Sequence, residues 1–94
     1  MKLNKIKFFK PNINISDNLA IVGSSASILK KENGKNIDSH NDVIRFNKAI
    51  TKNFEKFVGE KTTLRIINNH VFQSLKKDGI NEILSTNIAV VSPF

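Results

Sequence analysis

The segment LAIVGSSASILKKENGKNIDSHNDVIRF, residues 19–46, contains two apolar runs separated by a turn and a polar stretch. The first run, LAIVG, is continuous and ends at Gly23, a pattern typical of a strand buried on both faces of a parallel sheet. SSASILKKE predicts a short helix with Ser24 or Ser25 as its N-cap and Gly34 as its stop signal. The second run, DVIRF, contains β-branched residues and predicts a second strand.

The rest of the chain continues this alternation of strands and helical connections. NFEKFVGEK is expected to form a short amphipathic turn that ends at Gly59. TTLRIIN, residues 62–68, predicts a third strand, and NIAVVSPF predicts a fourth that ends at Pro93. Between them, apolar residues at helical spacing predict a helix over residues 71–84, which Gly79 can break.

These elements predict an α/β fold with a Rossmann-like parallel sheet flanked by helices. Residues 1–18 are expected to be a polar lead-in, and residues 19–94 a partial Rossmann-like domain. Doubly wound domains typically continue past four strands, so we expect the chain to be the N-terminal part of a larger domain.

The 94-residue chain is basic, with 15 Lys and Arg against 8 Asp and Glu and a formal net charge of +7. Such a balance can indicate nucleic acid or another anionic ligand. Nucleic-acid binding is nevertheless not expected, because the chain has no Trp or Tyr for stacking and only two Arg. The absence of Cys excludes disulfides and thiolate zinc sites.

Apolar runs in the sequence are short. A signal peptide needs a continuous apolar core of about 7–15 residues, and a membrane span needs about 20. We therefore expect a cytoplasmic chain, or one peripheral to a membrane through its surface or a partner.

The turn VGSSAS, residues 22–27, is a candidate nucleotide site. Gly23 can adopt positive φ and admit a ligand close to the backbone, and the following N–H groups and hydroxyls favour phosphate or ribose oxygens. The turn lacks the glycines of GxGxxG and the Gly-Lys-Ser/Thr of a P-loop, so these residues alone slightly favour a plain strand–helix turn with a serine cap. Asn47 follows the second strand, where its amide could bond a sugar or base edge, or simply form a turn.

Other polar residues have simpler structural readings. Arg45 is expected to be a buried ion-pair partner of Asp38 or Asp42. His40 and His70 have no nearby nucleophile and no partner at ligand spacing, so neither is assigned a catalytic role.

Taken together, the segment LAIVGSSASIL…GKNIDSHNDVIRFNKAITKNFEKFVGEKTT, residues 19–63, resembles the large sialylmotif of the family 29 sialyltransferases. The matching positions are Val22, Gly23, Ser25, Gly34, Ile37, Asp38, Ser39, His40, Asp42, Val43, Arg45, Asn47, Ala49, Phe54, Glu55, Val58, Gly59, Lys61, Thr62 and Thr63. NIAVVSPF is also similar to a later strand of the family that ends in Pro-Phe.

The resemblance implies a Rossmann-like glycosyltransferase that uses CMP-sialic acid, transfers to a glycan acceptor with inversion, and needs neither a metal nor another cofactor. Residues 19–94 would then be a donor-nucleotide-binding domain. Gly23, Ser24 and Ser27 would line the CMP pocket with Ser25 in the same turn, and Asn47 would bond the nucleotide. The catalytic histidine of the family lies far downstream of this motif, so no catalytic residue is assigned to this chain and it is not expected to turn over alone.

Some positions depart from the family pattern. Ser24 and Ser27 replace asparagines of the turn, and a hydroxyl reaches less far and offers one donor rather than two. Leu19 replaces the motif cysteine, so the disulfide of animal members is absent. These departures leave open whether the donor carries sialic acid or a related acidic sugar. A non-catalytic nucleotide-binding module is the main alternative, and a basic nucleic-acid-binding protein is a weaker one.

Overall fold

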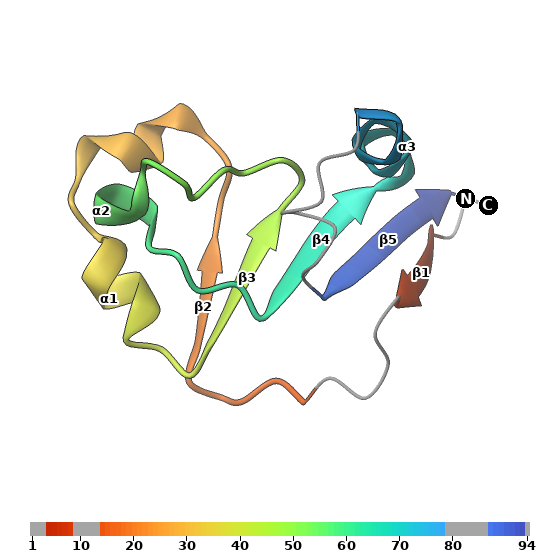
Figure 1. Cartoon of the computed structure of the whole chain (residues 1–94). Coiled ribbons are helices and arrows are strands. Elements are labelled where there is room, and N and C mark those ends of the chain that lie inside the picture. Colours follow the sequence, from red (N-terminus) through yellow and green to blue (C-terminus); the bar gives the residue numbers. More distant parts are fainter. Residues whose placement is uncertain (1–3, 9–13, 79–86, 94) are drawn as a thin grey trace.

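The computed structural model describes residues 4–8, 14–78 and 87–93, which form a sheet with helices beside it (Figure 1). In chain order the elements are β1 (Asn4–Phe8), β2 (Leu19–Val22), the 3₁₀ helix η1 (Ala26–Lys30), α1 (Gly34–Asp38), β3 (Asp42–Phe46), α2 (Glu55–Val58), β4 (Leu64–Asn68), α3 (Asn69–Asp78) and β5 (Ile88–Pro93).

Four of the strands form a parallel sheet, as the sequence predicts. The strand order is β1-β5-β4-β3-β2, and β2 to β5 are mutually parallel neighbours. In register, Val22 lies beside Arg45, Arg45 beside Arg65, and Arg65 beside Ile88. The expected α/β fold with a Rossmann-like parallel sheet is confirmed.

The helices pack on the side of the sheet that these paired residues share. Consecutive strands are added in one direction, and right-handed crossovers then bring the connections to one side. Figure 1 shows α1 and α2 beside β2 and β3, and α3 beside β4 and β5. Two apolar clusters result, one with Ile37 of α1 under β2 and β3, the other with Leu75 of α3 under β4 and β5.

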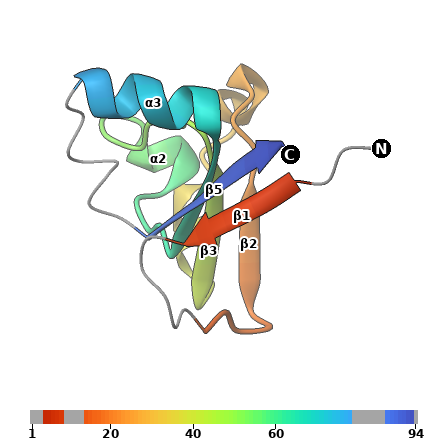
Figure 2. The same cartoon turned by 90° about the vertical axis from the view of Figure 1, so that its right-hand side faces the viewer.

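Strand β1 is an element that the sequence analysis does not assign, since it treats residues 1–18 as a polar lead-in. The strand pairs antiparallel with β5, with Asn4 beside Pro93 and Phe8 beside Ala89 (Figure 2). Its sequence, NKIKF, is a short alternating run with two lysines, and lysine is common on edge strands. Such a run is a weaker signal than the continuous apolar strands.

Gly34 has a role opposite to the predicted one, because it begins α1 instead of ending a helix. It is buried, and a Cβ at this position would collide with the backbone carbonyl oxygen of Glu55 at the start of α2. The glycine therefore permits α1 and α2 to approach each other closely. Sequence alone does not distinguish this requirement from a helix stop.

The remaining boundaries follow the predictions closely. Gly59 ends α2 at φ 72°, as expected. The helix predicted over residues 71–84 begins earlier, at Asn69, and is confirmed as far as Asp78; the remainder lies outside the described residues. β5 ends at Pro93, as predicted.

Candidate donor-nucleotide site

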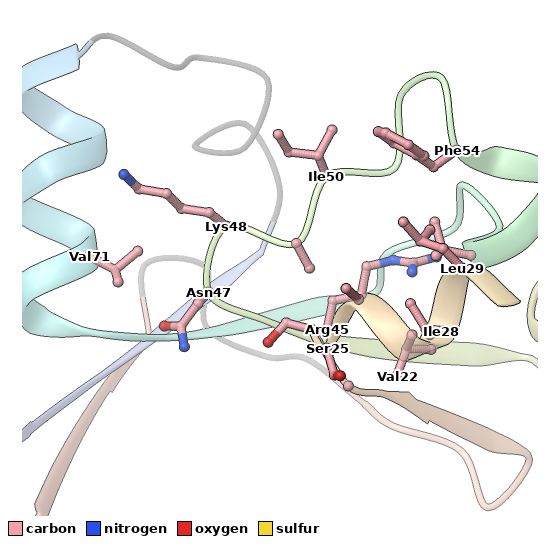
Figure 3. A pocket seen from close by; sticks show the side chains of 15 residues that line it. Val22, Ser25, Ile28, Leu29, Arg45, Asn47, Lys48, Ile50, Phe54 and Val71 are labelled. Atoms are coloured by element: carbon pink, nitrogen blue, oxygen red, sulfur yellow. The ribbon is translucent and has the colours of Figure 1, made fainter.

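A pocket of about 480 Å³ opens at the carboxyl ends of β2 and β3 (Figure 3). Ligands of open α/β sheets bind at this edge. Its walls come from the turn after β2, η1, the loop after β3, α2 and the first turn of α3. The lining residues are Val22, Gly23, Ser24, Ser25, Ala26, Ile28, Leu29, Arg45, Asn47, Lys48, Ala49, Ile50, Phe54, Val58 and Val71. The structure thus brings four predicted site residues, Gly23, Ser24, Ser25 and Asn47, to one pocket, and leaves Ser27 outside its lining.

Gly23 provides open space in this wall. A Cβ at this position would meet no heavy atom within 4 Å. Its φ is not positive, and Gly59 is the glycine with positive φ among the described residues. The possibility of positive φ is therefore not realised, and what remains is room for a ligand beside the backbone.

The three serines of the turn have different partners. The Ser25 hydroxyl is the N-cap of η1 and accepts a hydrogen bond from the Ser27 N–H at 3.3 Å, which confirms one of the two predicted caps. The Ser27 hydroxyl lies 3.1 Å from that of Ser25. The Ser24 side chain is exposed and has no hydrogen-bond partner among the residues that the structure describes, so its hydroxyl is available to a ligand.

Asn47 is held by the neighbouring strand β4. Its φ of 51° is in the left-handed region, which asparagine tolerates better than most residues. Its N–H donates to the Ile66 carbonyl at 2.9 Å, and its Oδ1 accepts from the Asn68 N–H at 3.1 Å. Nδ2 makes no hydrogen bond to the residues that the structure describes, so Asn47 can offer it to a ligand as a donor of two N–H bonds.

Asn68 does not line the pocket but holds Asn47, which does, and the sequence analysis does not single it out. It ends β4, and its own Oδ1 accepts from the Val71 N–H at 2.7 Å, which caps the first turn of α3. Its backbone N–H fixes the Asn47 amide. A polar residue at the end of the third predicted strand is the signal that could have indicated it.

The opposite end of the pocket is apolar. Figure 3 shows Ile28, Leu29 and Phe54 on the side away from Asn47, Lys48 and Val71. The Leu29 and Phe54 side chains are 38% and 39% exposed, so they present apolar surface to the cavity mouth. Lys48 is the lysine among the lining residues, and its Nζ donates to the Ser74 hydroxyl at 3.1 Å.

Arg45 forms the floor of the pocket but does not make the predicted ion pair. It is 1% exposed, and its Nε and Nη2 donate to the Lys61 carbonyl at 3.0 and 2.8 Å, with Nε also 3.0 Å from the Thr62 hydroxyl. Among the described residues the ion pair is instead Lys56–Glu32. Burial lowers the pKa of Arg45, and the negative charge of Asp38 partly opposes that shift.

The two candidate ion-pair carboxylates instead hold backbone segments together. Asp38 accepts from the N–H groups of Glu60 and Lys61, at 2.9 and 3.0 Å for the shortest contacts. Asp42 accepts from the Ser16 N–H at 2.7 Å and from the Thr63 hydroxyl at 3.0 Å. Arg45 and these two carboxylates thus bond carbonyls, hydroxyls and backbone N–H groups, an outcome that charge patterns in the sequence do not specify.

The two histidines are both outside the pocket lining. The Nδ1 atom of His40 lies 2.9 Å from the Asn36 carbonyl oxygen at the end of α1, which is a local structural contact. Within residues 4–8, 14–78 and 87–93, no cluster of three or more His, Cys, Asp or Glu could hold a metal ion, and no helix is long and apolar enough to cross a membrane.

Sequence comparison with known proteins places this chain in a family. The sequence model of glycosyltransferase family 29 (sialyltransferase) matches residues 6–93. Beta-galactoside alpha-2,6-sialyltransferase 2 of Xenopus tropicalis is 56% identical over 52 residues, which is 55% of this chain and 10% of that protein. The human protein of the same name is 41% identical over 73 residues, 78% of this chain and 14% of that protein. Beta-galactoside alpha-2,6-sialyltransferase 1 of Mus musculus is 41% identical over 58 residues, 62% of this chain and 14% of that protein.

The alignments with these three relatives span only 10–14% of the relatives' own length. The family model, in contrast, matches nearly all of the present sequence. The family match covers the turn after β2 and the loop after β3, the two segments that supply Ser24, Ser25 and Asn47 to the pocket, and also the end of β4, which holds Asn47. The chain belongs to glycosyltransferase family 29, the sialyltransferases.

Proposed function

We propose that this chain forms the donor-nucleotide part of a sialyltransferase site and binds the CMP portion of CMP-sialic acid. The observation that carries the proposal is that Ser24 and Asn47, whose hydroxyl and Nδ2 groups can both donate hydrogen bonds, line one pocket at the strand ends. Both groups lack a protein partner in the described part of the chain, so a ligand oxygen can be bonded at no cost to the fold.

The two ends of the pocket suit the two chemical parts of a nucleotide. Ser24 and Asn47 donate hydrogen bonds, which ribose and phosphate oxygens accept. Leu29, Ile50 and Phe54 offer apolar surface against which a pyrimidine ring can lie. In this orientation the sugar–phosphate part lies over the ends of β2 and β3, and the base lies toward α2.

The whole protein, on this proposal, transfers sialic acid to a glycan that ends in a β-galactoside, since its relatives carry the name beta-galactoside alpha-2,6-sialyltransferase. The 94-residue chain contributes donor binding. Neither histidine lies at the pocket, and we therefore expect donor binding without turnover by this chain alone.

The test is a titration of the purified chain with CMP, followed by ¹⁵N NMR, with cytidine, UMP and NAD as comparison ligands. We expect saturable binding of CMP, weaker binding of cytidine because it lacks the phosphate, and resonance changes at Ser24, Asn47 and Asn68. Absence of saturable CMP binding in a chain with a dispersed, folded spectrum would overturn the proposal. Binding to RNA that falls steeply with salt, without preference for CMP, would favour the nucleic-acid alternative.

A transfer assay separates the donor site from the complete enzyme. The chain is incubated with labelled CMP-sialic acid and a β-galactoside acceptor, and we expect bound donor and no labelled product. Labelled product would contradict the assignment of donor binding alone.

A further inference from the structure

Arg65 makes a pair of hydrogen bonds that the donor-site proposal does not use. It lies on β4, is 4% exposed, and its Nη1 donates to the carbonyl oxygens of Asn47 and Ala49, both at 2.8 Å. Hydrogen bonds from a charged donor to carbonyls are stronger than those between neutral groups. One buried nitrogen therefore joins the two ends of the three-residue turn that contains the site asparagine.

The same turn is fixed to β4 at two further points. The Asn47 N–H donates to the Ile66 carbonyl, and the Asn47 Oδ1 accepts from the Asn68 N–H. Residues 65, 66 and 68 of β4 thus hold the carbonyl, the N–H and the side chain of Asn47. Of these three attachments, the one from Arg65 also holds Ala49, and so sets the path of the chain after Asn47.

This arrangement matters because the backbone of Asn47 is in the left-handed region. Asparagine tolerates that region better than most residues, but a negative φ is still the more common backbone conformation, so the surrounding hydrogen bonds help to hold it there. If the carbonyls of Asn47 and Ala49 lost their donor, φ could return to negative values, and the amide would swing away from the pocket.

We propose that Arg65 is a positioning residue for the donor site, acting through the turn that it holds at Asn47 and Ala49. The proposal rests on the function proposed above, in which Asn47 bonds the nucleotide. The Arg65 side chain is buried beneath the turn and is not among the residues that line the pocket, so its effect on the ligand is indirect.

The primary experiment measures Asn47 and Asn68 without any ligand. We compare the wild-type chain with Arg65→Met by ¹⁵N NMR, following the Asn47 side-chain amide signals and hydrogen exchange of the Asn68 N–H. We expect R65M to move the Asn47 signals and to speed exchange at Asn68 about 10-fold or more, while the amide spectrum of β2 stays unchanged. Unchanged Asn47 and Asn68 signals would overturn the positioning role, whether or not CMP binds.

CMP affinity then provides a readout that a general structural role would not give. We expect R65M to weaken CMP binding about 10-fold in the wild-type background, and to have less than about a 2-fold effect in an Asn47→Ala background. Equal weakening in both backgrounds would show that Arg65 does not act through Asn47. If the wild-type chain binds no CMP, the proposed function fails, and the ligand-free NMR comparison still decides the positioning role.

Conservative variants keep the test valid if R65M does not fold. Arg65→Lys retains one nitrogen that can donate to two carbonyls, and we expect smaller changes at Asn47 and Asn68 than any neutral variant gives. Ile67→Val is the control on the same strand, since Ile67 is also buried but belongs to the apolar cluster with Leu75 and Val90 and does not line the pocket. Asn47 signals that move as far in I67V as in R65K would overturn the proposal.

Discussion

The Asn47 amide oxygen accepts a hydrogen bond from the Asn68 N–H at 3.1 Å, so the residue that follows β3 is fixed to the last residue of β4. This contact leaves the amide nitrogen of Asn47 as the group that can reach a ligand. Nδ2 makes no hydrogen bond to the described residues, so the pocket offers a donor at this position.

Asn47→Asp tests whether the Asn47 Nδ2 donor binds the nucleotide. The aspartate keeps an oxygen for the Asn68 N–H and tolerates the left-handed backbone, but it cannot donate and it adds negative charge near a phosphate. We expect CMP affinity to fall at least about 10-fold, since a hydrogen bond to a charged group contributes about 1.5–3 kcal/mol.

The control for this variant is Asn53→Asp. Asn53 also has a left-handed backbone, with φ 72°, but it lies outside the pocket lining. Calorimetric titration of both variants should show the loss in N47D alone. An equal loss in N53D would mean that net charge, and not the Asn47 donor, controls binding.

Gly34→Ala tests the close approach of α1 to α2. The added Cβ meets the carbonyl oxygen of Glu55, which belongs to the backbone and cannot rotate away. We expect the free energy of unfolding to fall by about 1–3 kcal/mol, as for other overpacked positions. Urea unfolding followed by circular dichroism measures the change.

Gly23→Ala is the matched glycine control. A Cβ there meets nothing within 4 Å, and φ is not positive. The free energy of unfolding should stay unchanged or rise by up to about 1 kcal/mol, because alanine restricts the unfolded chain. A loss in G23A as large as that in G34A would contradict the packing explanation.

Sequence reasoning recovers the parallel sheet because its signal is local. The runs at β2 and β5 are continuous and apolar, which is typical of parallel strands. The prediction that β2 is buried on both faces is wrong, because Ile21 is 65% exposed, whereas Ile88, Ala89 and Val90 bury both faces of β5. The roles of Gly34 and Arg45 depend instead on which backbone atoms arrive from distant segments, Glu55 in one case and Lys61 in the other. No local sequence pattern encodes those contacts, so the predictions of a helix stop at Gly34 and of an ion pair at Arg45 are wrong.

The candidate site also has a part that the sequence predicts and a part that it does not. Gly23, Ser24, Ser25 and Asn47 follow predicted strands, and their common edge of the sheet follows from parallel topology. Asn68 and Arg65 act through Asn47, and their contribution depends on the side-by-side register of β3 and β4. That register is visible only in three dimensions.

Asp38→Asn tests whether Asp38, one of the residues that match the sialylmotif, stabilises the fold. Asp38 accepts hydrogen bonds from the N–H groups of Glu60 and Lys61, and Lys61 in turn provides the carbonyl that Arg45 bonds. The neutral amide accepts more weakly, and we expect a loss of about 1–2 kcal/mol in the free energy of unfolding. Asp17→Asn, an exposed position, should leave it unchanged, and a loss in D17N equal to that in D38N would attribute the effect to net charge.

The serines of the turn distinguish what the structure implies from what the family resemblance alone implies. The resemblance assigns nucleotide contacts to Ser24 and Ser27, whereas in the structure Ser24 lines the pocket and Ser27 does not. Ser24→Ala should therefore lower CMP affinity about 3- to 10-fold, the range expected for one neutral hydrogen bond, with no change in stability. Ser27→Ala should leave CMP affinity unchanged.

Ser25→Ala completes this series, because Ser25 both lines the pocket and caps η1. Loss of the cap should lower the free energy of unfolding by about 0.5–1 kcal/mol, which neither S24A nor S27A should do. The three variants are compared by urea unfolding and by CMP titration under the same conditions. If S27A weakens CMP binding and S24A does not, the nucleotide lies farther along η1 than the pocket, and the orientation proposed for the donor is wrong.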